Sequence, residues 1–146
     1  MADIVNWRIV SYEGIGPIVF GMTPAQIEDL LGVPENVRTN RSGERDERRS
    51  GLAVRYSKSS NGVVEVELKE NFRPIIAGVD ILAVSDPLAK LREIDPEAYE
   101  CFGIAVFLTL GVSASLHLGS KEPGATITAF ARGRWDHFRA DFKPLK

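Results

Sequence analysis

The sequence predicts an α+β fold, in which an antiparallel sheet carries two short helices packed on one face. Alternating apolar and polar residues recur along the chain, which is typical of strands with one buried and one wet face. Two isolated helical segments, at residues 23–32 and 86–95, interrupt these stretches, as is usual in α+β folds. The 146 residues, 44% of them apolar, suffice for a single domain over 1–146 with its own core.

The first helix has clear start and stop signals. Thr23 is expected to cap its N-terminus, and Gln26, three residues later, completes a capping box. Pro24 suits the first helical position, and Gly32 suits the end. A helix of about two turns is unstable alone in water, so we expect it to pack on the sheet through Ile27. At the second helix, Ser85 or Asp86 is the expected cap.

The strands follow from runs of alternating or continuous apolar residues. Strands or extended runs are expected over residues 4–12, 18–20, 52–56, 64–68, 75–84, 102–110, 113–118 and 126–132, with a turn at 122–124. Residues 38–51 are dense in charge and have no apolar residue, which predicts a mobile loop. The mixed sequence after Trp135 predicts no element.

The order of these elements repeats once along the chain. An apolar run, a short helix and several strands occur in residues 1–73 and again in 74–146, offset by about sixty residues. The pattern indicates a possible tandem repeat of a helix-then-strands unit.

Residues 18–32, IVFGMTPAQIEDLLG, resemble the opening of the SmpA/OmlA (BamE-like) α/β modules. The same opening begins each half of the tandem-repeat β-lactamase inhibitor proteins. The second half departs from the motif, because residues 83–88 lack the Gly-Met-Thr. The resemblance implies a binding scaffold, of the kind found in assembly lipoproteins, enzyme inhibitors and the immunity proteins of bacterial toxins. Fold alone does not determine which of these roles applies.

Composition excludes several classes of function. A net charge of -2 argues against a nucleic-acid partner, because the phosphate backbone favours strongly basic proteins. The single Cys101 excludes an internal disulfide and any multi-cysteine metal site. Neither His117 nor His137 has metal-ligand spacing, so no metal or cofactor is expected. No secretion signal, lipid-acceptor cysteine near the N-terminus or membrane span stands out, so we expect a cytoplasmic protein without a membrane partner.

The candidate site residues point to binding rather than catalysis. Glu65 and Glu67 share one strand face, which suits a catalytic carboxylate pair but equally the wet face of any sheet, and we favour the latter. Arginine and tryptophan dominate interface energetics. The expected partner-binding residues are Arg55, Glu65, Glu67, His117, Arg132, Arg134 and Trp135.

Three functional hypotheses follow. The first is a bacterial immunity protein, without enzymatic activity, that binds and blocks a cognate toxin. The alternative is a small ligand-binding domain or enzyme with a pocket between sheet and helices. A third is a subunit of a larger assembly.

Overall fold

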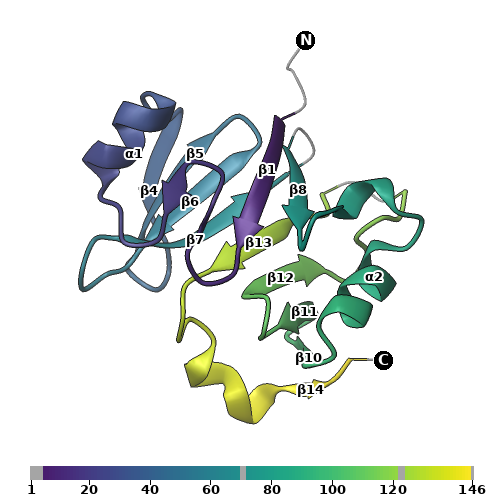
Figure 1. Ribbon diagram of the computed structural model, residues 1–146. Coiled ribbons are helices and arrows are strands. Elements are labelled where there is room, and N and C mark those ends of the chain that lie inside the picture. The colour runs from purple at the N-terminus through teal and green to yellow at the C-terminus, as the bar shows by residue number, and fades with distance from the viewer. Residues whose placement is uncertain (1–4, 70–71, 122–123, 146) are drawn as a thin grey trace.

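The computed structural model describes residues 5–69, 72–121 and 124–145, and it is an α+β fold with two sheets (Figure 1). The helices are α1 (Pro24–Leu31) and α2 (Pro87–Ile94), with short 3-10 helices η1 (Ile81–Ala83) and η2 (Asp136–Asp141). The strands are β1 (Val5–Val10), β2 (Gly14–Ile15), β3 (Ile18–Val19), β4 (Asn36–Thr39), β5 (Arg45–Arg49), β6 (Leu52–Tyr56), β7 (Val63–Leu68), β8 (Phe72–Ile76), β9 (Val79–Asp80), β10 (Ala98–Cys101), β11 (Ile104–Phe107), β12 (Val112–Ser115), β13 (Ile127–Phe130) and β14 (Lys143–Pro144).

The large sheet has nine strands in the order β14-β10-β11-β12-β13-β7-β6-β5-β4, and all its pairs are antiparallel. The strands that follow α1 form one side of it and those that follow α2 form the other, so β7 and β13 meet at the centre. Two helix-then-strands units therefore lie in mirrored order within one sheet.

The small sheet has the order β3-β2-β1-β8-β9 and was not predicted from the sequence. Its central pair, β1 and β8, is parallel, with Val5 opposite Phe72 and Ile9 opposite Ile76. Parallel partners require a long connection, so no local turn signal reveals this pairing. Both sheets thus join the first half of the chain to the second.

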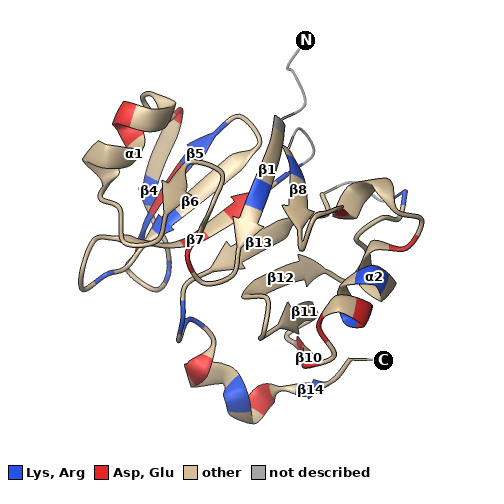
Figure 2. Cartoon of the chain, viewed as in Figure 1, with Lys and Arg blue, Asp and Glu red and all other residues tan. Residues whose placement is uncertain are grey.

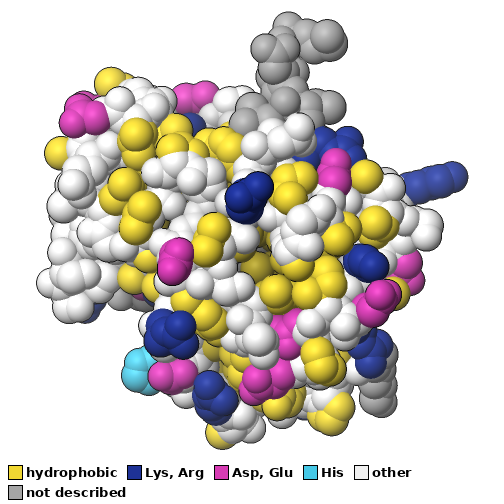
Figure 3. Space-filling model, viewed as in Figure 1, with side chains coloured by type: hydrophobic (Ala, Val, Ile, Leu, Met, Phe, Trp, Pro, Cys, Tyr) yellow, Lys and Arg dark blue, Asp and Glu magenta, His cyan; other side chains and the backbone are white. Residues whose placement is uncertain are grey.

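The main core lies between one face of the large sheet and a layer formed by the small sheet and both helices. Ile27 of α1 and Leu91 of α2 are fully buried in one cluster with Val54, Val66 and Val112 of the large sheet. Both helices therefore pack on the same face, as predicted. Figure 3 shows apolar side chains gathered over this front layer beside α1. Among the described helices, none has the length and apolarity needed to cross a membrane.

The capping box of α1 is confirmed. The Thr23 hydroxyl accepts from the Gln26 N–H at 3.3 Å, and the Gln26 side chain accepts from the Thr23 N–H at 2.9 Å. Gly32 ends the helix with φ +86°, a left-handed value that favours glycine. In α2, the cap is Asp86, whose carboxylate accepts from the Ala89 N–H at 3.1 Å.

The prediction of a loop over residues 38–51 is wrong, because this segment forms most of the β4–β5 hairpin. Glu44, Asp46 and Glu47 are buried there. Their charges are neutralised by neighbouring arginines, so the hairpin is held by ion pairs rather than by apolar burial.

The extended run predicted over 75–84 is broken by a turn at Ala77 and Gly78 into the end of β8, β9 and η1. Other predicted boundaries shift by a few residues or lie outside the described residues. The strand expected over 102–110 shortens to β11, because Phe102 and Gly103 form the turn that joins it to β10. The C-terminal tail, which had no predicted element, forms η2 and β14, and β14 pairs with β10. Ile4 of the first predicted strand, and residues 122 and 123 of the predicted turn, lie outside the described residues.

Replacing Thr23 tests the contribution of the capping box. Thr23→Ala is expected to lower the free energy of unfolding by about 1 kcal/mol, because the Gln26 N–H loses its acceptor. Thr23→Ser keeps the hydroxyl, and its free energy of unfolding should stay within a few tenths of a kcal/mol of that of the parent protein. Urea titration measures both variants, and equal losses would show that the methyl group, not the cap, stabilises this position.

Candidate functional site

The face of the large sheet opposite the main core, here called the outer face, carries a row of charges. On β6, Val54 points into the core, and Arg55 therefore points to the outer face. Strand register aligns one outward residue from each of β4, β5, β6, β7 and β13: Arg38, Asp46, Arg55, Glu65 and Phe130. Figure 2 shows acidic and basic positions on these strands. The four charged residues of the row alternate in sign. Since neighbouring strands lie about 4.8 Å apart, each of these charges has an opposite charge close beside it.

Arg55 is the centre of this row and binds three carboxylates. Its Nε donates to Asp46 at 3.3 Å, its Nη2 donates to Glu67 at 2.7 Å, and its Nη1 donates to Glu65. Its side chain is only 17% exposed. Although burial lowers the pKa of Arg55, the negative charges of Glu65 and Glu67 outweigh that effect and raise it above the usual value. Arg55 therefore stays charged and fixed in place.

Arg134 extends the network beyond the end of β13. It donates two hydrogen bonds to Glu44 and a third, at 3.1 Å, to Glu65. Arg48 donates to Asp46 at 3.2 Å on the other side. The ion network, defined as Glu44, Asp46, Arg48, Arg55, Glu65, Glu67 and Arg134, thus ties β5, β6 and β7 to the segment that leads into η2.

A hollow of about 280 Å³ lies beside the ion network. A second outward row runs along it, in which Glu67 of β7 lies opposite Thr128 of β13, and Thr128 lies opposite Ser113 of β12. Trp135 also lines the hollow, and its indole N–H is buried without a partner among the described residues. The hollow therefore combines carboxylates, hydroxyls and one aromatic wall.

Glu47 anchors a second set of ion pairs on the opposite face of β5. It accepts from the Tyr56 hydroxyl at 2.7 Å, from Arg45 at 2.7 Å and from Arg49 at 3.0 Å. Arg49 also donates to the Gly32 carbonyl at the end of α1, at 2.8 and 3.1 Å. A cation at a helix C-terminus satisfies carbonyls that have no partner within the helix. Glu47 thus positions the residue that holds α1 against β5.

The buried carboxylates of the hairpin ionise more readily than usual. The Arg134 hydrogen bonds lower the pKa of Glu44, against a smaller opposing effect of burial. Burial raises the pKa values of Asp46 and Glu47, but hydrogen bonds and charges from Arg48 and Arg55 at Asp46, and hydrogen bonds from Tyr56 and nearby arginines at Glu47, outweigh it. All three pKa values therefore lie below those of the unfolded chain.

The structure brings together five of the seven expected partner-binding residues. Arg55, Glu65, Glu67 and Arg134 belong to the ion network, and Trp135 lines the adjacent hollow. The other two belong neither to the ion network nor to the lining of the hollow. Arg132 stacks on Tyr12, at 4.4 Å from the ring centroid, and His117 lies in the turn beyond β12 and does not line the hollow.

Glu65 and Glu67 do share one face of β7, but both are bound to Arg55. Sequence reasoning missed Glu44, Asp46 and Tyr12. For Asp46 a signal was present, since the alternation in residues 45–49, RDERR, places Asp46 and Arg48 on one face of a strand and the remaining charges on the other.

The described residues contain no group of three or more His, Cys, Asp and Glu side chains that could hold a metal ion. Comparison with protein-family models, with curated proteins and with solved structures found no match.

Acidification is expected to destabilise the protein through the hairpin carboxylates. Because their pKa values are lowered on folding, their contribution is complete above about pH 4.5 and is lost as the pH falls through the folded values. Urea unfolding at about pH 7 and about pH 3 measures this loss. Glu44→Gln, which removes one of these groups, should show a weaker pH dependence, and stability independent of pH would contradict the account.

Removing Arg55 should destabilise the fold more than removing any exposed arginine. Arg55→Met leaves three carboxylates without their shared cation and is expected to cost about 2–4 kcal/mol of unfolding free energy. The matched control is Arg38→Met, whose side chain is 59% exposed and should cost less than about 1 kcal/mol. If both variants lost the same free energy of unfolding in urea titrations, Arg55 would contribute no more to stability than the exposed Arg38.

Proposed function

We propose that this chain is a bacterial immunity protein that binds a cognate toxin and blocks it, and that it acts by binding rather than by catalysis. The observation that carries the proposal is the outer face of the large sheet, where the ion network holds several charges in fixed positions. Fixed charges lose little conformational entropy on binding, and their pattern selects a partner of complementary potential.

The composition of this face also favours a protein partner. Arginine and tryptophan are the residue types that contribute most at protein interfaces, and this face has Arg38 at its rim and Trp135 beside its hollow. The Arg38 side chain is more than half exposed, and one end of its guanidinium lies 3.6 Å from Asp46. The donors that do not face Asp46 can reach a bound partner. The resemblance of residues 18–32 to modules found in inhibitors points the same way.

A second candidate function has one supporting observation. A pocket of about 360 Å³ lies between the end of α1 and strands of both sheets, lined by apolar side chains that include Trp7, Leu31, Leu52 and Phe72. Its position matches the alternative of a small ligand-binding domain. The carboxylates considered above for an enzyme, Glu65 and Glu67, are both bound by Arg55, which does not favour catalysis by this pair.

Co-expression with the protein encoded by the neighbouring gene tests the proposal. A toxin that kills the host when expressed alone should be tolerated when this chain is present, and the two should elute together in size-exclusion chromatography. Arg38→Glu reverses a rim charge on the outer face and is expected to weaken the complex about tenfold.

Arg8→Glu is the matched control, because Arg8 is exposed on β1 of the small sheet. It should leave both the complex and the urea midpoint unchanged, whereas Arg38→Glu, which faces Asp46, should lower the midpoint slightly and still unfold in one cooperative transition. The proposal fails if no neighbouring gene product binds the chain, or if Arg8→Glu weakens the complex as much as Arg38→Glu.

A further inference from the structure

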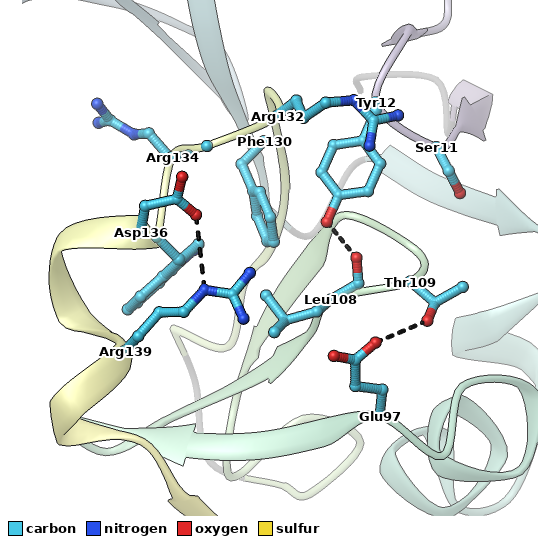
Figure 4. Close-up of a pocket in the computed structure, with 12 residues that line it drawn as sticks. Ser11, Tyr12, Glu97, Leu108, Thr109, Phe130, Arg132, Arg134, Asp136 and Arg139 are labelled. Carbon is cyan, nitrogen blue, oxygen red and sulfur yellow. Dashed lines mark hydrogen bonds and ion pairs between the residues drawn. The ribbon is translucent and has the colours of Figure 1, made fainter.

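A cleft of about 720 Å³ lies between the loop after β1 and the start of η2 (Figure 4). Leu108 and Phe130 contribute apolar surface to it, and Tyr12, Arg132 and Arg139 contribute polar groups. This cleft is distinct from the hollow beside the ion network, although Trp135 lines both.

Tyr12 holds Arg132 in place at this cleft. Tyr12 has a left-handed backbone, with φ +62°, a conformation that is unfavourable for a bulky residue and recurs at functional sites. Its hydroxyl donates to the Leu108 carbonyl, and the Arg132 guanidinium lies 4.4 Å from the centre of its ring. Among the described residues no carboxylate lies within ion-pair distance of Arg132, so its donors remain available to a ligand.

Arg139 supplies a second cation to the same cleft. Its Nε lies 3.6 Å from Asp136, and both side chains are at least 60% exposed, so this surface pair is weak and readily replaced. Figure 4 shows the Arg139 guanidinium facing the cleft and Arg134 directed away from it. Arg134 is bound by Glu44 and Glu65 and is not available.

Two carboxylates line the cleft, and only one of them, Asp136, lies beside Arg139. Glu97 lies across the cleft from Arg132 in Figure 4 and is hydrogen-bonded to the Thr109 hydroxyl at 3.3 Å. An anionic group is therefore attracted to the Arg132 side of the cleft and repelled from the Glu97 side. Because a guanidinium presents paired N–H donors, a carboxylate matches it better than a neutral group does.

Exposed aromatic side chains continue from the cleft. Trp135 contacts the Phe138 ring at 5.7 Å between centroids, and Phe138 contacts the Phe102 ring at 5.5 Å. Phe102 is 67% exposed at the tip of the β10–β11 hairpin and has φ +52°, where asparagine or glycine would be more stable. Local folding does not explain a phenylalanine there, whereas contact with an apolar group of another molecule does.

From this geometry we infer that the cleft binds an acidic side chain of a partner protein, while the Phe102–Phe138 pair packs against an apolar side chain of the same segment. The inference rests on the proposed function, since it names the chemistry of the segment that an inhibited partner presents. The exposed aromatic pair favours a polypeptide over a small free anion, because a small anion leaves the rings in water.

Peptide titration tests the inference without the cognate toxin. The probes are capped peptides with an aspartate and a leucine about three residues apart, in either order, a spacing close to 10 Å in an extended chain. Matched peptides replace leucine with glycine, or aspartate with lysine. Two-dimensional amide and arginine Nε–H NMR spectra should show saturable shifts at Arg132 and Thr109 with the Asp–Leu peptides, and none with the Lys peptides.

Four variants separate the contributions. Arg132→Gln should weaken binding at least about tenfold, and Glu97→Gln should strengthen it about two- to fivefold by removing a repulsion. Phe102→Asn should remove the advantage of the leucine peptide over the glycine peptide without lowering the urea midpoint, because asparagine tolerates φ +52°. Arg41→Gln, at an exposed arginine of the β4–β5 turn, should change nothing.

Several results would overturn the inference. Binding that survives Arg132→Gln, or that is equal for aspartate and lysine peptides, removes the carboxylate site. Acetate or phosphate that binds as tightly as the peptides reduces the cleft to a small-anion site. Concentration-dependent shifts before peptide is added would identify a second copy of the chain as the occupant. If the peptides bind as expected but no neighbouring toxin does, only the proposed immunity function fails.

Discussion

The large sheet depends on the neutralisation of the charges that its strands bring together. Arg55 is the shared partner of Asp46, Glu65 and Glu67, and these residues come from three adjacent strands. A buried carboxylate without a cation would be strongly unfavourable, so the register of β5, β6 and β7 and the presence of Arg55 require each other. On the opposite face of β5, Glu47 and Arg49 do the same for the hairpin and for the end of α1. Ion pairs stabilise this part of the sheet, whereas apolar burial stabilises its centre.

The two halves of the chain are joined at two places, and this determines what the outer face contains. Antiparallel pairing of β7 with β13 makes one continuous sheet, and parallel pairing of β1 with β8 makes the layer that covers its inner face. Beyond β13 the chain crosses the outer face. Arg134 joins the ion network there, and Trp135 packs on Phe130 in a small second core. The cleft that holds Arg132 lies between this crossing and the loop after β1.

The ion network and the cleft that holds Arg132 contribute differently to the recognition of a partner. In the ion network most charges already have partners, so it offers a rigid pattern of potential rather than vacant donors. Arg132 lies over the Tyr12 ring with no carboxylate beside it among the described residues, and Phe102 and Phe138 are exposed. The network is therefore suited to maintaining the shape of the face, and the cleft with its aromatic neighbours to direct contact. This division explains why charged residues that look equivalent in the sequence have different surroundings in the fold.

Local chemistry alone determined much of this protein. The capping box at Thr23, the ends of α1, the strands at β6 and β7 and the shared face of Glu65 and Glu67 all depend on residues close in sequence, where hydrogen-bond patterns and side-chain period act directly. The tertiary structure alone decided the second sheet, the parallel β1–β8 pair, the folding of residues 38–51 and the pairing of Arg134 with Glu44. The strand partner of β1 and the partner of Glu44 are far away in the sequence. The charges of residues 38–51 look solvent-exposed until Arg55 and Arg134, from outside the hairpin, lie beside them.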